Sequence, residues 1–307
     1  MSFTAQDVKT LREKTGAGMM ECKKALDAAS GNMEKAIEHL RKQGLAAASK
    51  KAGRIAAEGA VRAFVSSDCK SAALVELNCE TDFVAKTDDF LGLADQIASL
   101  VVSQKLESVE SVLASKIGEL TVEQAISEKI AKIGEKITLR RLELFQGSGS
   151  YMVSYIHGAG SIGTVVEIGL GDVNKAQASD FVEFSKDLAM HTAAAAPRYL
   201  AKDEVPQEAI LKELEIYKEV LRKEGKKEEM LDKIAEGKLG KFFEDVCLLH
   251  QPFVKDPKTK ITQLLESQSK KLGTELVIRR FARFVLGEGI EKKQGDFAAE
   301  VMSQVKV

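Results

Sequence analysis

Hydrophobic positions recur at helical spacing along the first part of the chain. Val8 and Leu11 mark one apolar stripe, residues 22–29 carry a second, and Asn32 can cap a third helix over residues 33–43. Three short helices so close together predict a mini-bundle. The small and basic stretch that follows, SKKAGRIAAEG, is predicted to be a linker.

Beyond the bundle the pattern changes to short apolar segments that occur twice. Residues 72–78 (AALVELN) and 163–169 (GTVVEIG) correspond at an offset of 91 positions, and the offset holds without a gap over some 35 residues. A repeat of this length indicates a duplicated unit. Each copy is predicted to contain a strand, a turn, a second strand, a loop and a helix.

A third strand closes each copy at a different offset. Residues 134–145 match residues 273–284, now 139 positions apart. The difference between the two offsets predicts an insertion of 48 residues in the second copy, between about residues 196 and 245.

The insertion has the pattern of paired helices. Its apolar residues recur at alternating spacings of four and three: Ile210, Leu214, Tyr217 and Leu221. Such a series is typical of the seam of a helix that packs along another helix. The sequence GKK offers a turn, and a second series is predicted to start the return: Met230, Ile234 and Ala235. We therefore expect a helical hairpin.

Composition narrows the classes of function. The 307 residues include 45 Lys and Arg against 46 Asp and Glu, so no overall positive field attracts nucleic acid. No apolar run approaches the roughly 20 residues of a membrane span, and the N-terminus lacks the pattern of a signal peptide. The expected compartment is the cytoplasm. We interpret the four cysteines as small buried hydrophobic thiols: Cys22, Cys69, Cys79 and Cys247.

Enzyme chemistry has little support in the sequence. The segment GAGSIG at residues 158–163 fits the dinucleotide-binding pattern, but that motif requires a helix next, and TVVEIGL is typical of a strand. We interpret it as a glycine-rich hairpin turn, with a nucleotide-dependent enzyme as the rival hypothesis. No set of residues has the spacing of metal ligands or of an acid–base pair, so no catalytic residue, metal site or cofactor is predicted.

Among the four histidines, His157 is the candidate for a function. It follows a predicted strand and adjoins Gly158, at a tip that a partner can approach. We expect His39 to be solvated, and His191 and His250 to be packed.

Phe83 stands in the sequence TDFV, in a predicted loop after the second strand. At the 91-residue offset the second copy has DVNK, which contains no aromatic residue, while the neighbouring strand and helix keep their apolar positions. The repeated scaffold therefore does not require an aromatic side chain there. We predict that Phe83 points outward, beside Asp82, as an anchor for a partner's pocket.

The doublet Met19-Met20 precedes a predicted helix. Adjacent positions on a helix face different ways, so one of the two methionines should be exposed, on a surface flanked by Arg12 and Lys23.

Several motifs together resemble one known family. They are TGAGMMECKKAL (15–26), AAEG (56–59), NCETDFVAK (78–86), AKIGE (131–135), the His157-Gly158 turn, QPFV (251–254) and the closing GEGIEK and DFAAEV. From end to end the chain is similar to bacterial translation elongation factor Ts, and TGAGMM and TDFVAK are highly specific to that family.

The resemblance implies an α+β fold with a UBA-like three-helix bundle, a duplicated core of two subdomains, a coiled-coil hairpin and a C-terminal helical module. The expected ranges are 1–55 for the bundle, 56–148 for the first subdomain, 149–195 with 241–286 for the second, 196–240 for the hairpin and 287–307 for the C-terminal module.

The implied function is nucleotide exchange on the GTPase elongation factor Tu, without an active site. One predicted contact set would disturb the GTPase's magnesium and phosphate site: Thr81, Asp82, Phe83 and Val84. His157 and Gly158 would act near its phosphate-binding loop. A third set would bind the nucleotide domain from the other side: Arg12, Met19, Met20 and Lys23. The hairpin is a candidate for self-association, and a helical-hairpin scaffold without exchange activity is the alternative hypothesis.

Overall fold

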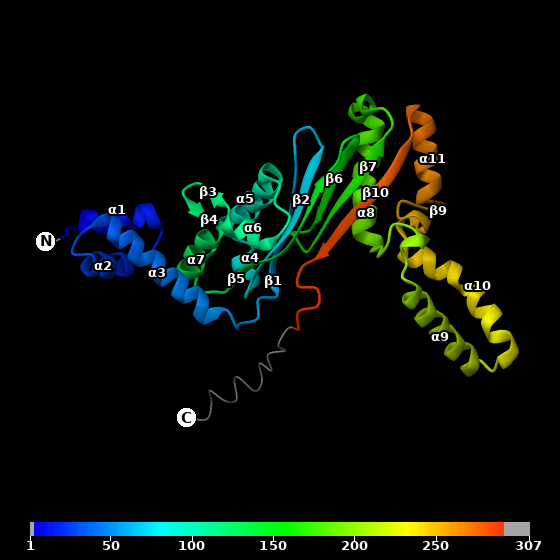
Figure 1. Cartoon of the computed structure of the whole chain (residues 1–307), viewed down its shortest axis with the longest axis horizontal. Helices are drawn as coiled ribbons and strands as arrows, with labels where there is room; N and C mark the ends of the chain where they lie inside the picture. Colours follow the sequence, from blue (N-terminus) through cyan, green and yellow to red (C-terminus); the bar gives the residue numbers. More distant parts are fainter. Residues whose placement is uncertain (1–2, 292–307) are drawn as a thin grey trace.

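The computed structural model describes residues 3–291 and has a mixed α+β fold, as the sequence predicts. The chain is elongated, with a helical bundle at one end, a helical hairpin at the other, and two three-stranded sheets between them (Figure 1). The helix predicted around Phe297, Val301 and Met302 lies outside the described residues.

Three helices form the N-terminal bundle: α1 (Ala5–Thr15), α2 (Met19–Ala28) and α3 (Met33–Lys51). Thr4 caps α1 and Asn32 caps α3, because the side chain of each accepts a hydrogen bond from a backbone amide three residues further on. Leu11, Cys22 and Leu26 are fully buried where the helices meet.

α3 is longer than predicted, because it continues to Lys51 and absorbs the first part of the expected linker. Gly44 lies inside it, where α3 packs on α7 (Val122–Ile133). A Cβ added at Gly44 would lie 3.4 Å from the backbone oxygen of Ser127, at the near edge of van der Waals contact, so the two helices pack closely here. The bundle is therefore joined to the core by a continuous helix that is packed against it.

Both copies of the repeat fold in the same order, as predicted. The first contains β1 (Glu58–Val65), β2 (Ser71–Cys79), α4 (Asp82–Ala85), α5 (Asp88–Gln104) and β5 (Ile137–Gln146). The second contains β6 (Ser150–His157), β7 (Ile162–Leu170), the 3-10 helix η1 (Val173–Gln177), α8 (Ser179–Ala195) and β10 (Leu276–Val285). The antiparallel sheets have the orders β1-β2-β5 and β10-β7-β6, so the second strand of each copy is central.

Shorter elements complete each copy. The first also holds α6 (Val109–Ala114), β3 (Lys116–Ile117), β4 (Leu120–Thr121) and α7. The second holds η2 (Lys202–Glu204), η3 (Leu248–His250), β8 (Pro252–Phe253), β9 (Asp256–Lys260) and α11 (Ile261–Leu272).

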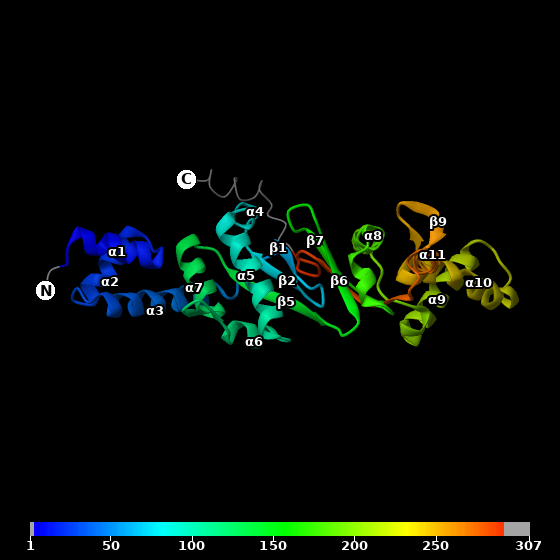
Figure 2. The same cartoon turned by 90° about the horizontal axis from the view of Figure 1, so that it is seen from above.

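The core has four layers, in the order helix, sheet, sheet, helix (Figure 2). α5 and α7 pack on the outer face of the first sheet, and α8 and α11 pack on that of the second. Between the sheets lies a third apolar cluster: Val61, Ala72, Leu74, Phe145, Met152, Val165 and Phe284. The central strands β2 and β7 are consequently buried on both faces, which explains their almost unbroken apolar sequences.

A β-bulge recurs in the closing strand of each copy. Arg140 is the extra residue where β5 shifts its register against β2, and Arg279 is the extra residue at the equivalent place in β10. In the first copy the bulge lets two consecutive arginines reach one carboxylate: Arg140 and Arg141 donate to the buried Glu76 at 3.0 and 2.6 Å.

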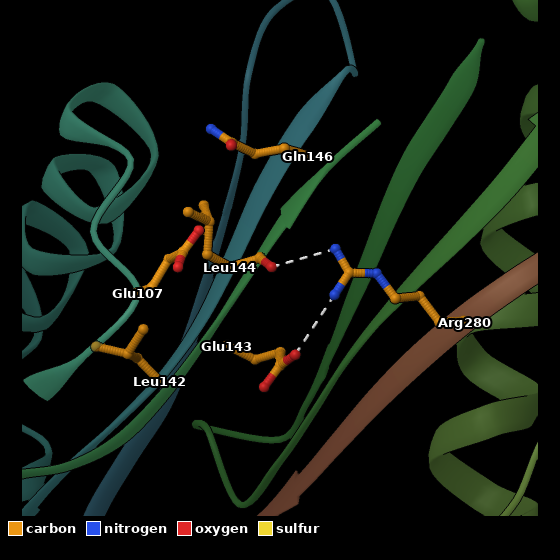
Figure 3. A pocket seen from close by; sticks show the side chains of 6 residues that line it. All are labelled: Glu107, Leu142, Glu143, Leu144, Gln146 and Arg280. Atoms are coloured by element: carbon orange, nitrogen blue, oxygen red, sulfur yellow. Dashed lines mark hydrogen bonds and ion pairs between the residues drawn. The ribbon is translucent and has the colours of Figure 1, made fainter. Parts of the chain in front are cut away.

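Arg280 makes the equivalent bond to Glu167 at 2.9 Å and also crosses to the first copy. It donates to the carbonyl of Leu144 at 3.2 Å and pairs with Glu143 at 3.5 Å (Figure 3). These residues line an open cleft of about 370 Å³ that also carries Glu107. Two carboxylates and an arginine that is already paired make this cleft unsuited to the phosphates of a nucleotide.

The insertion forms the predicted hairpin, from α9 (Gln207–Lys223) and α10 (Glu228–Val246). Leu221, Leu231 and Ala235 are buried between the two helices. Met230 was a predicted seam residue but is 52% exposed, because its neighbour Leu231 takes the inward position. α10 also continues past the predicted hairpin boundary at residue 240.

The cysteines are all free thiols, and three of them are buried as predicted: Cys22, Cys79 and Cys247. The prediction is wrong for Cys69, which is only partly buried. Cys69 lies in the turn between β1 and β2 with a φ of 55°, at the end of the hairpin and outside the apolar cluster between the two sheets.

Candidate functional site

Phe83 is 80% exposed, more than any other large hydrophobic side chain in the described part of the chain. It lies on α4, a four-residue helix, and not in the loop that the sequence predicts. Thr81 caps α4, because its hydroxyl accepts a hydrogen bond from the backbone amide of Val84 at 3.4 Å. The phenyl ring therefore projects from a fixed turn of helix.

Val84 does not share this exposure. It is 9% exposed and belongs to the apolar core of the first copy, together with Ala85. Successive residues on a helix face different directions, so a turn that presents Phe83 must point Val84 inward. In this structure the side chain of Val84 therefore anchors α4 from within.

Asp82 is exposed beside Phe83 and forms an ion pair with Lys86, one turn later, at 2.6 Å. The hydrogen bond from Lys86 lowers the pKa of the Asp82 carboxyl below its ordinary value. The exposed end of α4 thus combines an apolar ring with an ionised carboxylate at neutral pH.

Two carboxylates hold this turn, and sequence reasoning missed both. Glu135 accepts hydrogen bonds from the hydroxyl of Thr81 at 2.6 Å and from the backbone amides of Thr81 and Glu80 at 3.0 and 3.2 Å. Glu80 in turn accepts a hydrogen bond from the backbone amide of Lys136 at 2.6 Å. A comparison of the two copies could have indicated Glu135, because the second copy has a different residue, Thr274, at the equivalent position.

His157 and Gly158 are exposed at the tip of the hairpin between β6 and β7. The hydroxyl of Tyr155 lies 3.1 Å from Nδ1 of His157. Gly158 has a φ of 58°, in the left-handed region that glycine adopts without strain. The segment GAGSIG is therefore a hairpin turn followed by a strand, as predicted, and it lacks the helix that a dinucleotide site requires.

The His157 hairpin packs on β1, in the other copy of the repeat. The backbone amide of Val61 donates to the carbonyl of Gly160 at 2.8 Å. A Cβ at Gly160 would lie only 2.9 Å from the backbone oxygen of Val61, so this close approach requires glycine. Because α4 also contacts β1, one strand supports both the Phe83 helix and the His157 hairpin.

The remaining predicted contact residues lie on the N-terminal bundle, away from these two sites (Figure 1). Met19 and Met20 open α2 and are 57% and 64% exposed, so both methionines are exposed, where only one was predicted. Arg12 on α1 and Lys23 on α2 are also exposed. The bundle thus presents two apolar side chains together with basic ones.

Among residues 3–291, no group of three or more His, Cys, Asp and Glu side chains is arranged to hold a metal ion. Over the same residues, no helix is both long and apolar enough to cross a membrane.

Comparison with known proteins identifies the family. The model of the family described as Elongation factor TS matches residues 80–288. Elongation factor Ts of Clostridium perfringens is 48% identical over 300 residues, which cover 97% of this chain and 98% of the relative. That of Methylococcus capsulatus is 48% identical over 307 residues, 100% of this chain and 99% of the relative. The chain belongs to the elongation factor Ts family.

Proposed function

We propose that this chain is a guanine nucleotide exchange factor for the GTPase elongation factor Tu. It binds the GDP-bound GTPase and promotes GDP release by disturbing the magnesium and phosphate site, so that GTP can rebind during polypeptide elongation. Membership of the elongation factor Ts family supports this function. Since polypeptide elongation takes place in the cytoplasm, we propose this compartment for the chain.

The single observation that carries the mechanism is the exposure of Phe83 on a capped helix. Burying a phenylalanine side chain in a partner's apolar pocket contributes about 1.5–3 kcal/mol. Because α4 already fixes the backbone, little conformational entropy is lost on binding. Asp82 brings a carboxylate to the same place, where it competes for the magnesium ion and repels the phosphates of GDP.

Exchange of this kind requires no covalent step. A protein that binds the nucleotide-free GTPase more tightly than the GDP-bound form must weaken GDP binding by the same ratio, because binding at two linked sites is reciprocal. GDP affinity depends on magnesium and on the backbone donors around the phosphates, so displacing either one loosens the nucleotide. We therefore assign no catalytic residue and no cofactor to the chain.

We assign the other predicted residues to the same interface. His157 and Gly158 contact the GTPase near its phosphate-binding loop, from the hairpin that shares β1 with α4. The N-terminal bundle, which we take to be UBA-like, contacts the nucleotide domain through four exposed residues: Arg12, Met19, Met20 and Lys23. The coiled-coil hairpin of α9 and α10 remains a candidate for self-association.

Release of a fluorescent GDP analogue from elongation factor Tu, at a fixed magnesium concentration, tests the proposal. The wild-type chain should accelerate release strongly, and Phe83→Ala should lose most of the acceleration. The matched control is Val173→Ala, since Val173 is a 49% exposed apolar residue on η1, the short helix at the equivalent place in the second copy. The control should behave as the wild type. Absence of acceleration by the folded wild type would exclude the exchange function.

The two rival hypotheses predict different results. A scaffold that works through its hairpin would tolerate Phe83→Ala but lose function when residues 206–235 are deleted. A nucleotide-dependent enzyme would retain a bound dinucleotide after purification. Against the scaffold hypothesis, we expect Phe83→Ala to reduce the exchange rate more than the deletion of residues 206–235 does. Against the enzyme hypothesis, we expect no bound dinucleotide.

A further inference from the structure

Glu135 makes more hydrogen bonds to the base of the Phe83 helix than any other side chain in the described part of the chain. Its carboxylate accepts from the hydroxyl of Thr81 at 2.6 Å and from the backbone amides of Thr81 and Glu80 at 3.0 and 3.2 Å. Thr81 is the residue that caps α4, so its hydroxyl donates to Glu135 while accepting from Val84. Hydrogen bonds to an ionised acceptor are about twice as strong as neutral ones.

A second carboxylate, that of Glu80, links the residues before α4 to the residue that follows Glu135. Glu80 accepts from the backbone amide of Lys136 at 2.6 Å and pairs with Arg54 at 3.2 Å. The ammonium group of Lys136 donates to the carbonyls of Ala52 and Arg54 at 2.6 and 2.8 Å, just beyond the end of α3. We call Glu80, Glu135 and Lys136 the clasp. The clasp ties the start of α4 both to β5 and to the segment that leads from the bundle.

The second copy of the repeat serves as an internal control. Thr274 occupies the position of Glu135, and its hydroxyl accepts one hydrogen bond, from the backbone amide of Asp172 at 2.8 Å. Asp172 corresponds to Thr81, so both copies anchor the same turn from the same position. The scaffold thus needs only a neutral hydroxyl there. The three bonds to a carboxylate occur in the copy that presents Phe83, and in the other copy no aromatic ring is presented.

We propose that Glu135 is a positioning residue for nucleotide exchange: through Thr81 and Glu80 it fixes the orientation of α4 and hence of Phe83. The inference rests on the proposed exchange function. Glu135 lies in the short connection between α7 and β5. It acts on the partner only through the turn of Glu80 and Thr81 that it holds.

The test replaces Glu135 by the residue that the second copy uses. Glu135→Thr should lower the maximal rate of GDP release from elongation factor Tu about tenfold, because a shift of the ring by about 1 Å is enough to spoil such a contact. The concentration of factor at half-maximal rate should change less, since the bundle and the His157 hairpin still bind. Thr274→Ala removes the anchor of the equivalent turn and should leave exchange unchanged.

A double mutant separates positioning from a general loss of stability. If Glu135 acts through Phe83, Glu135→Thr should have almost no further effect in the Phe83→Ala background. An equal loss in both backgrounds would overturn the proposal, and so would an unchanged maximal rate for Glu135→Thr. Failure of the wild type itself to accelerate release would instead exclude the exchange function, so the two failures are distinguishable.

Amide hydrogen exchange in the free protein gives a readout that does not depend on the GTPase. Glu135→Thr should speed exchange at the amides of Thr81 and Val84, while the amides of β2 and α5 keep the wild-type rates. Unchanged protection of Thr81 and Val84 would also overturn the proposal. Glu135→Gln, which keeps the shape and an acceptor oxygen, should restore part of the protection and part of the exchange rate.

Discussion

The guanidinium carbon of Arg141 lies 4.2 Å from the ring centre of Phe284, which places a cation of the first copy over an aromatic ring of the second. The reciprocal contact also exists, since Arg280 lies 4.2 Å from the ring centre of Phe145. Arg280 and Phe284 stand 139 positions after Arg141 and Phe145. The two copies therefore exchange the same pair of side chains across their interface, as a pseudo-twofold dimer would.

Glu76 holds Arg141 in this arrangement, as Glu167 holds Arg280. Burial favours its neutral form, but hydrogen bonds from the Gly287 amide, Arg140 and Arg141 outweigh burial and lower the pKa of Glu76. Glu76→Ala removes the buried carboxylate that Arg140 and Arg141 share, although Arg141 keeps its pair with Glu288 at 3.3 Å, and we expect it to reduce the free energy of unfolding by about 3 kcal/mol. Chemical denaturation measures this change.

Glu143→Ala is the matched control, because Glu143 is a half-buried carboxylate of the same interface, with a side chain 46% exposed, that pairs with Arg280 at 3.5 Å. A partly exposed pair of this kind contributes at most about 1 kcal/mol. Equal losses for the two variants would contradict the role of Glu76 in holding the copies together.

We expect substitutions of Phe83 and of Phe90 to have opposite effects on stability and function. Phe83 is 80% exposed and Phe90 is 1% exposed, although both stand near the start of a helix in the same copy. Phe83→Ala should change the free energy of unfolding by less than about 0.5 kcal/mol, whereas Phe90→Ala should reduce it by about 3–5 kcal/mol. Thermal and denaturant unfolding of the two variants test this contrast. A large loss of stability for Phe83→Ala would mean that the ring packs within the chain.

The cysteines should differ in reactivity. Burial, with the nearby charge of Glu135, raises the pKa of Cys79 to about 12. Burial also raises the pKa of Cys22 and of Cys247. Since the thiolate is the reactive form, a disulfide reagent at pH 8 should modify Cys69 rapidly and the other three only after unfolding. Cys69→Ser should abolish the fast phase, and a fast phase that persists in this variant would contradict the assignment.

His191 should make stability fall at mildly acidic pH. Burial lowers the pKa of His191 below 6.5, its value in the unfolded chain. Its Nδ1 accepts from the amide of Val254 at 3.3 Å, and its Nε2 lies 3.1 Å from the amide oxygen of Gln251. A second proton on the ring would oppose the bond from Val254. Because the folded pKa is the lower one, this contribution to stability is complete above pH 6.5 and declines as the pH falls toward the folded pKa.

Denaturant unfolding between pH 5 and 7.5 measures the decline, and an NMR titration assigns it to His191. Burial and the neighbouring lysines Lys202 and Lys260 also lower the pKa of His250. His250→Gln is therefore the control variant, and it should retain most of the pH dependence. A His191 resonance that titrates at or above pH 6.5 would contradict the prediction.

The repeat made most of the core predictable from the sequence. The two offsets located every strand of the two large sheets and the insertion, because apolar alternation and equivalent positions constrain each other across the copies. The extension of α3 could not be read from its own pattern. It depends on packing against α7, which is distant in the sequence.

The site was predicted in part. The repeat correctly indicated an outward Phe83, since the second copy lacks the ring. It did not reveal that the segment is helical, because four residues are too few for a period and the cap by Thr81 decides the conformation. The hydrogen bonds of Glu135 join residues 54 positions apart along the chain, and no local pattern indicates such a contact.

The length of α3 sets the spacing between the two ends of the proposed interface. Its 19 residues span about 28 Å at 1.5 Å per residue, and its last turns pack on α7. A partner held first at the bundle therefore meets Phe83 at a high effective concentration, because the second contact forms within the complex and not from solution. Each contact then lengthens the residence time of the other. Substitutions at Met19 and Met20 should consequently show their effect in the dissociation rate.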